Sequence, residues 1–132
     1  MSRRNLPSLR ISHSGTSTED FMLYTSEDST HVFVTLGMVF PDLQSRDVYA
    51  VQIELQRLGT AGVWNTIGTR SVQIGRRGAG YRHQQNVEWG NIGQFGQQMQ
   101  TRLTIRRGVL VGGVPRISPQ TPIVRIGQTW IR

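Results

Sequence analysis

The stretch DVYAVQIELQRL (residues 47–58) decides the fold, because apolar and polar residues alternate along its whole length. Alternate side chains of a β-strand point to opposite faces of the sheet, so a period of two marks a strand with one buried face. The face predicted to be buried is Tyr49, Val51, Ile53 and Leu55. The opposite face is Ala50, Gln52, Glu54 and Gln56.

The residues after this strand predict a hairpin. Residues 59–62 (GTAG) form a polar turn, and residues 63–67 (VWNTI) return as the second strand. Gly68 then allows a change of direction before a further strand at residues 70–74 (RSVQI). Trp64 lies in the returning strand, where a tryptophan most often packs in the core or against a paired strand.

The same period of two recurs in other stretches. In HVFVTLGMVF (residues 31–40), Gly37 offers a place for a bulge in a strand whose inward residues are Val32, Val34 and Leu36. In QMQTRLTIRR (residues 98–107), the predicted inward residues are Met99, Leu103 and Ile105. The predicted outward polar row of that strand is Gln100, Arg102, Thr104 and Arg106.

Shorter strands bounded by Gly, Pro, Asn or Ser are expected at residues 9–11, 21–25, 86–89, 108–111 and 122–126. About eight or nine such strands predict an all-β fold, either a single antiparallel β-sandwich of immunoglobulin-like type or a small barrel. We expect three parts: an extended N-terminal arm (1–20), a β-sandwich core (21–111), and an extended C-terminal segment, punctuated by Pro and Gly, with the final strands (112–132).

A chain of 132 residues is long enough for one domain, which buries roughly two thirds of the surface of its unfolded state. It has no cysteine, which excludes disulfides, thiol catalysis and thiolate metal sites. No stretch approaches the roughly 18 apolar residues that span a bilayer, and the start MSRRNLPSLRISHSG lacks the apolar segment of a secretory signal. We therefore expect no membrane partner.

Charge is divided unevenly along the chain, and all 15 basic residues are arginines. Residues 1–54 carry four arginines and seven acids, a net charge of −3, whereas residues 55–132 carry eleven arginines and Glu88 alone, a net charge of +10. The arginine side chain pairs bidentately with carboxylates and phosphates. The division predicts an acidic protein surface or nucleic acid as the partner of the C-terminal part, and it permits head-to-tail contacts between copies.

Three segments, IELQRLGTAGVWNTIGTRSVQI, NVEWG and QMQTRLTIRRG, follow one another between residues 48 and 108. Together they resemble the middle strands of immunoglobulin-like and fibronectin-like domains, including those on bacteriophage virions. Unlike antibody-type members, the chain lacks the cysteine pair and an evident tyrosine corner. The resemblance implies a binding or surface-covering module, and it brings no catalytic residues.

The titratable residues form no recognisable reaction centre. His13, His31 and His83 lie far apart and lack the spacing of metal ligands. The Glu-Asp pairs at residues 19–20 and 27–28 are interpreted as solvated strand ends rather than as a calcium site. No base, nucleophile and oxyanion donor can be paired, so we expect a protein that is not an enzyme and that holds no metal and no cofactor.

The arginines define the candidate contact residues. GRRGAG (residues 75–80) lacks the lysine, hydroxyl and helix of a phosphate-binding loop, and we interpret it as a loop between strands that contacts anions. The arginines of this patch are Arg76, Arg77 and Arg82. A second patch, with a solvated strand face as the alternative, is Arg102, Arg106 and Arg107. The terminal segments add Arg3, Arg4, Arg10 and Trp130.

These features predict a structural protein of a virus particle, and specifically a bacteriophage head decoration or cement protein that binds capsid subunits. Such a protein would be made in the host cytoplasm, reside in the virion, and form a homo-oligomer or a symmetric array. A coat, neck or tail-fibre component is the alternative within the same class.

Two other classes of protein compete with this interpretation. A binder of single-stranded nucleic acid would need stacking aromatic side chains among its arginines, and the candidates are Tyr81, Trp89 and Phe95. A carbohydrate-binding module would need an exposed flat platform made by Trp64, Trp89 and Trp130.

Overall fold

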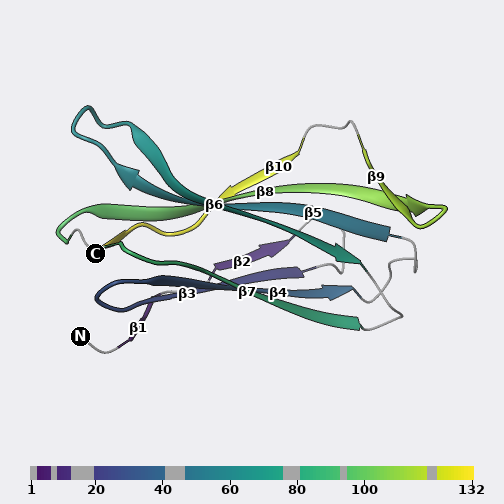
Figure 1. Cartoon of the computed structure of the whole chain (residues 1–132), viewed down its shortest axis with the longest axis horizontal. Coiled ribbons are helices and arrows are strands. Elements are labelled where there is room, and N and C mark those ends of the chain that lie inside the picture. Colours follow the sequence, from purple (N-terminus) through teal and green to yellow (C-terminus); the bar gives the residue numbers. More distant parts are fainter. Residues whose placement is uncertain are drawn as a thin grey trace.

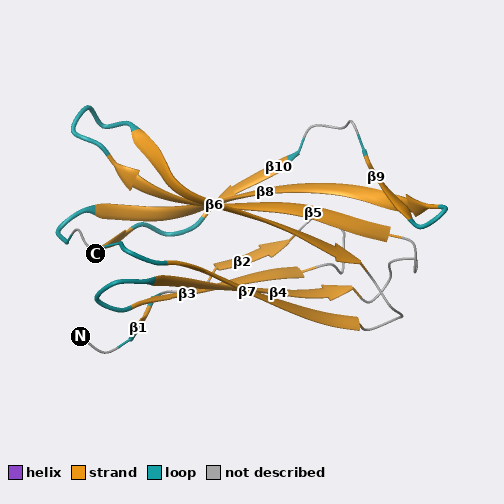
Figure 2. Cartoon of the chain, viewed as in Figure 1, coloured by secondary structure: helices purple, strands orange, loops and turns teal. Residues whose placement is uncertain are grey.

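The computed structural model of the chain consists of two antiparallel β-sheets that lie face to face, and Figure 1 shows them as an upper and a lower layer. The structure describes residues 3–6, 9–12, 20–40, 47–75, 81–92, 95–118 and 122–132. The regular secondary structure within these ranges consists of β-strands, and Figure 2 draws only strands and loops there. The all-β prediction is confirmed as a sandwich, because no described strand pairs with both sheets to close a barrel.

The lower sheet, which we call sheet A, is built on β3, β4 and β7, which pair in that order. Two short strands, β1 and β2, follow each other along the other edge of β3. The strands of sheet A are β1 Arg4–Asn5, β2 Leu9–Ser12, β3 Asp20–Glu27, β4 Val32–Phe40 and β7 Tyr81–Trp89. Within the N-terminal arm expected at residues 1–20, the described stretches 3–6 and 9–12 contain β1 and β2, and both strands are paired to this sheet.

The upper sheet, sheet B, is built on β8, β5 and β6. Its strands are β5 Asp47–Leu58, β6 Trp64–Gly75, β8 Gln98–Val111, β9 Val114–Ile117, β10 Ile123–Ile126 and β11 Trp130–Ile131. β5 pairs along one edge of β8, and β11, β10 and β9 pair in succession along its other edge. The extended C-terminal segment therefore adds three short strands to the sheet.

The core lies between the two sheets and contains the inward faces predicted from the alternation. The four predicted residues of β5 and the three of β8 are at most 2% exposed. Sheet A packs against them with Leu23, Val32, Val34 and Leu36. Burial of each aliphatic side chain of this size contributes roughly 1.5–3 kcal/mol, so the packed inner faces are the main stabilising feature of the sandwich.

The predicted change of direction at Gly68 is wrong, because β6 continues as a single strand from Trp64 to Gly75. Leu55 pairs with Gly68 while Gln56 pairs with Thr66, which leaves Ile67 as the extra residue of a β-bulge. Gly68 instead provides space for the other sheet: a Cβ atom there would lie 2.3 Å from Cδ1 of Trp89.

Two further expectations about single strands differ from the structure. Gly37 forms no bulge, since β4 keeps an unbroken register with both β3 and β7. The outward row of β8 is only partly exposed, because Gln100 and Thr104 are 5% and 7% exposed. Gln100 Nε2 donates a hydrogen bond to Oε1 of Gln56 at 2.8 Å, so neighbouring polar side chains cover this row. The segment at residues 108–111 is also the end of β8 rather than a separate strand.

Candidate functional site

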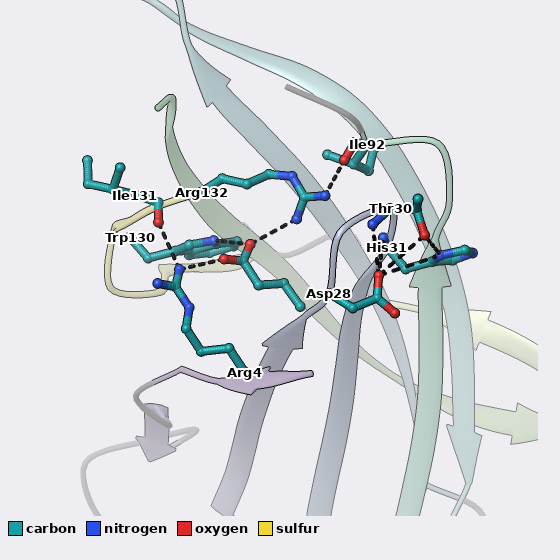
Figure 3. Close-up of polar contacts among 9 residues, drawn as sticks. Arg4, Asp28, Thr30, His31, Ile92, Trp130, Ile131 and Arg132 are labelled. Atoms are coloured by element: carbon teal, nitrogen blue, oxygen red, sulfur yellow. Dashed lines mark hydrogen bonds and ion pairs between the residues drawn. The ribbon is translucent and has the colours of Figure 1, made fainter. Parts of the chain in front are cut away.

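The last residue of β3, Glu27, has a fully buried carboxylate on which several segments converge. Arg132 Nη1 and Trp130 Nε1 both donate to Glu27 Oε2 at 3.0 Å, and Arg4 Nη2 donates to Oε1. Figure 3 shows Arg4 of the N-terminal segment and Trp130 and Arg132 of the C-terminal segment approaching this group. The interpretation of Glu27 as a solvated strand end is therefore wrong.

The arginines around Glu27 also bind backbone carbonyls, which links both terminal segments to the sandwich. Arg4 Nη2 donates to the carbonyl of Ile131 at 2.8 Å, and Arg132 Nη2 donates to the carbonyl of Ile92. A buried carboxylate requires charged partners and hydrogen bonds to offset its loss of hydration. Because donors occupy both carboxylate oxygens, the cluster holds the fold together and offers no reactive group to a substrate.

The turn between β3 and β4 is organised by Asp28, the residue after the buried glutamate. Its Oδ1 accepts hydrogen bonds from the backbone N–H of Thr30 at 2.9 Å and of His31 at 2.7 Å. The N–H of Thr30, followed by that of His31, lowers the pKa of Asp28 below its usual value. His31 Nδ1 lies 2.6 Å from Thr30 Oγ1, and its ring stacks on Phe33 with 5.7 Å between centroids. The turn is a structural motif.

The arginines of the N-terminal segment are partly engaged within the molecule. Arg3 Nε donates to Ser26 Oγ at 2.6 Å, and the Arg3 guanidinium carbon lies 4.1 Å from the centroid of the Phe33 ring. Arg4 keeps half of its side chain exposed while it pairs with Glu27. Arg10 lies in β2 and Arg82 in β7, but their side chains are not among the described ones, and Arg76 and Arg77 lie outside the described residues.

The predicted patch on β8 is divided between the two faces of its strand. Arg102 and Arg106 are on the outer face of sheet B, opposite Glu54 and Ala50 of β5. Arg102 Nη1 lies 3.7 Å from Oε2 of Glu54, and Arg106 is exposed. Arg107 is exposed on the other face, so it does not join the same surface.

Arg107 instead shares a surface with an arginine that the sequence analysis did not single out. A recess of about 270 Å³ at the junction of β8 and β9 is lined by Arg107, Gly108, Val109, Arg116 and Ser118. The signal was present in VLVGGVPRI, because two glycines between β-branched residues are a strong hairpin signal.

A larger recess, about 400 Å³, lies on the outer face of sheet A. It is lined by Arg3, Phe33, Val34, Thr35, Asn86, Val87 and Glu88. Thr35 Oγ1 donates to Asn86 Oδ1 at 2.8 Å across the floor, and Arg3 lies over the Phe33 ring. The aromatic ring of this recess is thus already covered by Arg3, and Glu88 at its edge is exposed.

The tryptophans do not form an exposed platform. Trp89 and Trp130 belong to the core, 4% and 8% exposed, while Trp64 on the protruding β5–β6 hairpin is half-buried. Trp130 also donates its indole N–H to Glu27, so this predicted contact residue has a structural role. Phe95 is exposed, yet the guanidinium of Arg132 lies 5.0 Å from its ring centroid. The platform that a carbohydrate-binding module would need is therefore not formed.

The edges of the two sheets are joined on the β6–β7 side by one arginine. Arg70 of β6 donates Nη2 to the carbonyl of Glu88 at 3.0 Å, and its guanidinium lies 5.7 Å from the Trp89 ring. Together with the close approach of Gly68, this contact covers Trp89 at the edge of the sandwich.

Among the described side chains, no three His, Asp or Glu residues are grouped so that they could hold a metal ion. The described part of the chain also has no helix suited to crossing a membrane. No protein-family model and no curated protein matches the sequence.

Proposed function

We propose that this protein is a non-enzymatic structural component of a virus particle, and specifically a bacteriophage head decoration or cement protein that binds capsid subunits. The observation that carries the proposal is the difference in charge between the two sheets. The strands of sheet B contain seven arginines and two acids, whereas those of sheet A contain three of each. A rigid sandwich with one cationic layer is suited to lie on an acidic protein surface.

The way in which the chain is held together supports the same function. The buried Glu27 cluster joins β1, β3 and the C-terminal residues, so both terminal segments are fastened to one compact unit. Arginine forks on such a unit can pair with capsid carboxylates without reorganisation of the backbone. Each contact would be weak, and repetition over many symmetry-related sites would supply the strength.

Assembly distinguishes this proposal from its nearest alternative. A coat, neck or tail-fibre component would form shells, rings or fibres by itself, whereas a decoration protein adds to a shell formed by other subunits. Both kinds of protein form homo-oligomers or symmetric arrays on the particle. The purified protein alone distinguishes them, and its size in solution is the relevant measurement. A monomer or small oligomer supports decoration, and spontaneous shells, rings or fibres would contradict it.

Binding to single-stranded nucleic acid is the candidate function from another class, and the aromatic side chains argue against it. Of the three predicted stacking residues, Trp89 is buried, and the guanidinium of Arg132 lies over the otherwise exposed ring of Phe95. The side chain of Tyr81 is not among the described ones. Stacking of bases on aromatic rings supplies much of the affinity of such proteins, at about 1–3 kcal/mol per base. Titration with a dT20 oligonucleotide at low and moderate salt should therefore leave tryptophan emission unchanged and show only weak, salt-sensitive association.

The direct test is sedimentation with virus particles. Lysate of the source organism would be separated on a density gradient before and after nuclease treatment, and the protein would be followed by immunoblot. We expect it in fractions that contain intact particles, in a fixed ratio to the major capsid protein and insensitive to nuclease. Recovery only in the slow fractions, or loss from the particles after nuclease treatment, would refute the proposal.

A further inference from the structure

The hairpin formed by the end of β8 and by β9, residues 108–117, is a rigidly built extension of sheet B. Gly112 and Gly113 have φ values of 58° and 78°, as the two-residue turn of a tight hairpin requires. A Cβ atom at Gly108 would lie 2.4 Å from the carbonyl oxygen of Arg116, so the backbone of β9 passes close to β8 at this glycine and leaves no room for a side chain. The N–H of Ser118 donates to the carbonyl of Arg107 at 2.9 Å and extends the ladder.

One face of this hairpin continues the inward face of sheet B. Ile105 is a buried core residue of β8. Side chains two positions apart in a strand point to the same face, so Arg107, Val109 and Val111 lie on the face of Ile105. Because Val111 pairs with Val114 and Val109 with Arg116, those two residues of β9 lie on the same face. We call this set the hairpin face: Arg107, Val109, Val111, Val114 and Arg116.

The part of the hairpin face nearest the turn consists of valines, and much of it is open to solvent. Val111 and Val114 are 56% and 53% exposed, although their face is the one that forms the core further along the sheet. Figure 1 shows the reason: the β8–β9 hairpin extends at the right-hand end beyond the strands of sheet A. The strands of sheet A cover the rest of the inward face, but they do not reach the hairpin at this end.

Charge indicates what kind of segment would cover the hairpin face. Arg107 and Arg116 border the 270 Å³ recess beside Val109, and residues 89–132 contain no acid. A segment with acidic side chains at one or two positions and aliphatic ones between them would pair with the guanidinium of Arg116 and bury the valines. Pro115 on β9 lacks a backbone donor, which disfavours addition of a strand at that edge and favours packing over the face.

The same contacts distinguish between classes of partner. Nucleic acid is disfavoured because the hairpin face has no aromatic ring on which a base could stack. A second copy of this chain is a poor match for this site. Glu27, Asp28 and Glu54 already have polar partners. The exposed Glu88 is the one acid between residues 55 and 132, so the sequence around it is not an acidic segment. An acidic extended segment of a different protein remains.

We propose that the hairpin face is the docking site for an acidic, extended segment of another protein, which packs over it as the missing layer of the sandwich. The chemistry of the site stands by itself, and the assignment of the partner as a capsid subunit rests on the proposed function.

The test uses fluorescence anisotropy with a labelled nine-residue peptide in which Glu, Val, Val and Glu alternate with threonine, so that two valines and two glutamates lie on the same face of the extended peptide. The variants of the hairpin face are Arg116→Glu and Val114→Thr. Each has a matched control: Arg125→Glu changes the charge equally at an exposed site on β10 of the same sheet, and Val63→Thr alters a similarly exposed valine at the β5–β6 turn. Unchanged circular dichroism and melting temperature would show that all four variants fold.

We expect the peptide to bind the unaltered protein, and each hairpin variant to weaken binding about tenfold, which corresponds to about 1.4 kcal/mol. The control variants should stay within about twofold. An equal loss for Arg116→Glu and Arg125→Glu would mean diffuse charge attraction and would overturn the proposal. Binding of dT20 that is tighter than that of the peptide and equally sensitive to Val114→Thr would overturn it too.

Particle occupancy separates failure of this inference from failure of the proposed function. If the unaltered protein sediments with particles and Arg116→Glu does so equally well, the hairpin face is not the docking site and the function stands. If the unaltered protein does not sediment with particles, the proposed function fails, and the peptide titration still decides whether the hairpin face binds acidic segments.

Discussion

Arg132 and Glu27, 105 residues apart in the chain, form an ion pair at 3.0 Å in which neither side chain is exposed. Removal of one member of such a pair leaves an uncompensated buried charge, which typically costs about 3–5 kcal/mol. We expect Glu27→Gln to lower the free energy of unfolding by about 3 kcal/mol, measured by urea denaturation. The control is Glu88→Gln on the exposed outer face of sheet A, and an equal, small effect of both changes would contradict the assigned role of Glu27.

The contact between Gly68 and Trp89 predicts a second stability difference. Because a Cβ atom at Gly68 would lie 2.3 Å from the Trp89 ring, Gly68→Ala has to displace that ring and should cost about 1–3 kcal/mol. Gly37→Ala is the matched control, since its nearest neighbour would be at an ordinary 3.8 Å. Thermal unfolding of the two variants checks this, and an equal melting temperature would refute the close approach.

The edge contact of Arg70 predicts a spectroscopic change. Arg70→Ala removes the hydrogen bond to the carbonyl of Glu88 and uncovers Trp89, so the tryptophan emission should shift to longer wavelength. The loss of stability should be about 1 kcal/mol, because the side chain is exposed. Arg125→Ala serves as the control, since Arg125 donates only to the carbonyl of its neighbour Val124, and it should leave the emission unchanged.

The Asp28 turn predicts part of the dependence of stability on pH. The N–H groups of Thr30 and His31 hold the pKa of Asp28 below its usual 3.8, and unfolding removes them. The contribution of this group is therefore complete above the unfolded pKa and is lost as the pH falls through the lower, folded pKa. Asp28→Asn keeps the acceptor oxygen but removes the titration, so its unfolding midpoint should fall less steeply in this range. A carboxyl carbon titration by NMR that gives an ordinary pKa would contradict the prediction.

The alternation in residues 47–58 was sufficient to predict β5 and its buried face, because a period of two depends only on neighbours along the strand. The location of Glu27 was not predictable in this way. The local sequence TSEDST indicates a strand end and a turn, which is correct for Asp28. The burial of the preceding residue depends on Arg132 and Trp130, more than 100 residues later, and no local pattern records that pairing.

The remaining differences have the same origin. Gly68 was interpreted as a break in a strand, and its actual role depends on Trp89 in the other sheet. The β8–β9 hairpin is different, because its two glycines were a local signal and its turn could have been predicted. What the sequence could not provide is the length of sheet A at that end, which decides that the valines of the hairpin face are uncovered.

The hydrogen bond from Arg4 to the carbonyl of Ile131 also has a consequence for engineering. β1 and the C-terminal residues bound to it lie at one end of the long axis, and the β8–β9 hairpin lies at the opposite end (Figure 1). A polypeptide fused at either end would therefore project from the pole remote from the hairpin. If the hairpin face binds the capsid, such a fusion would project away from the capsid surface. The chain is then a candidate scaffold for presenting antigens or enzymes on a particle.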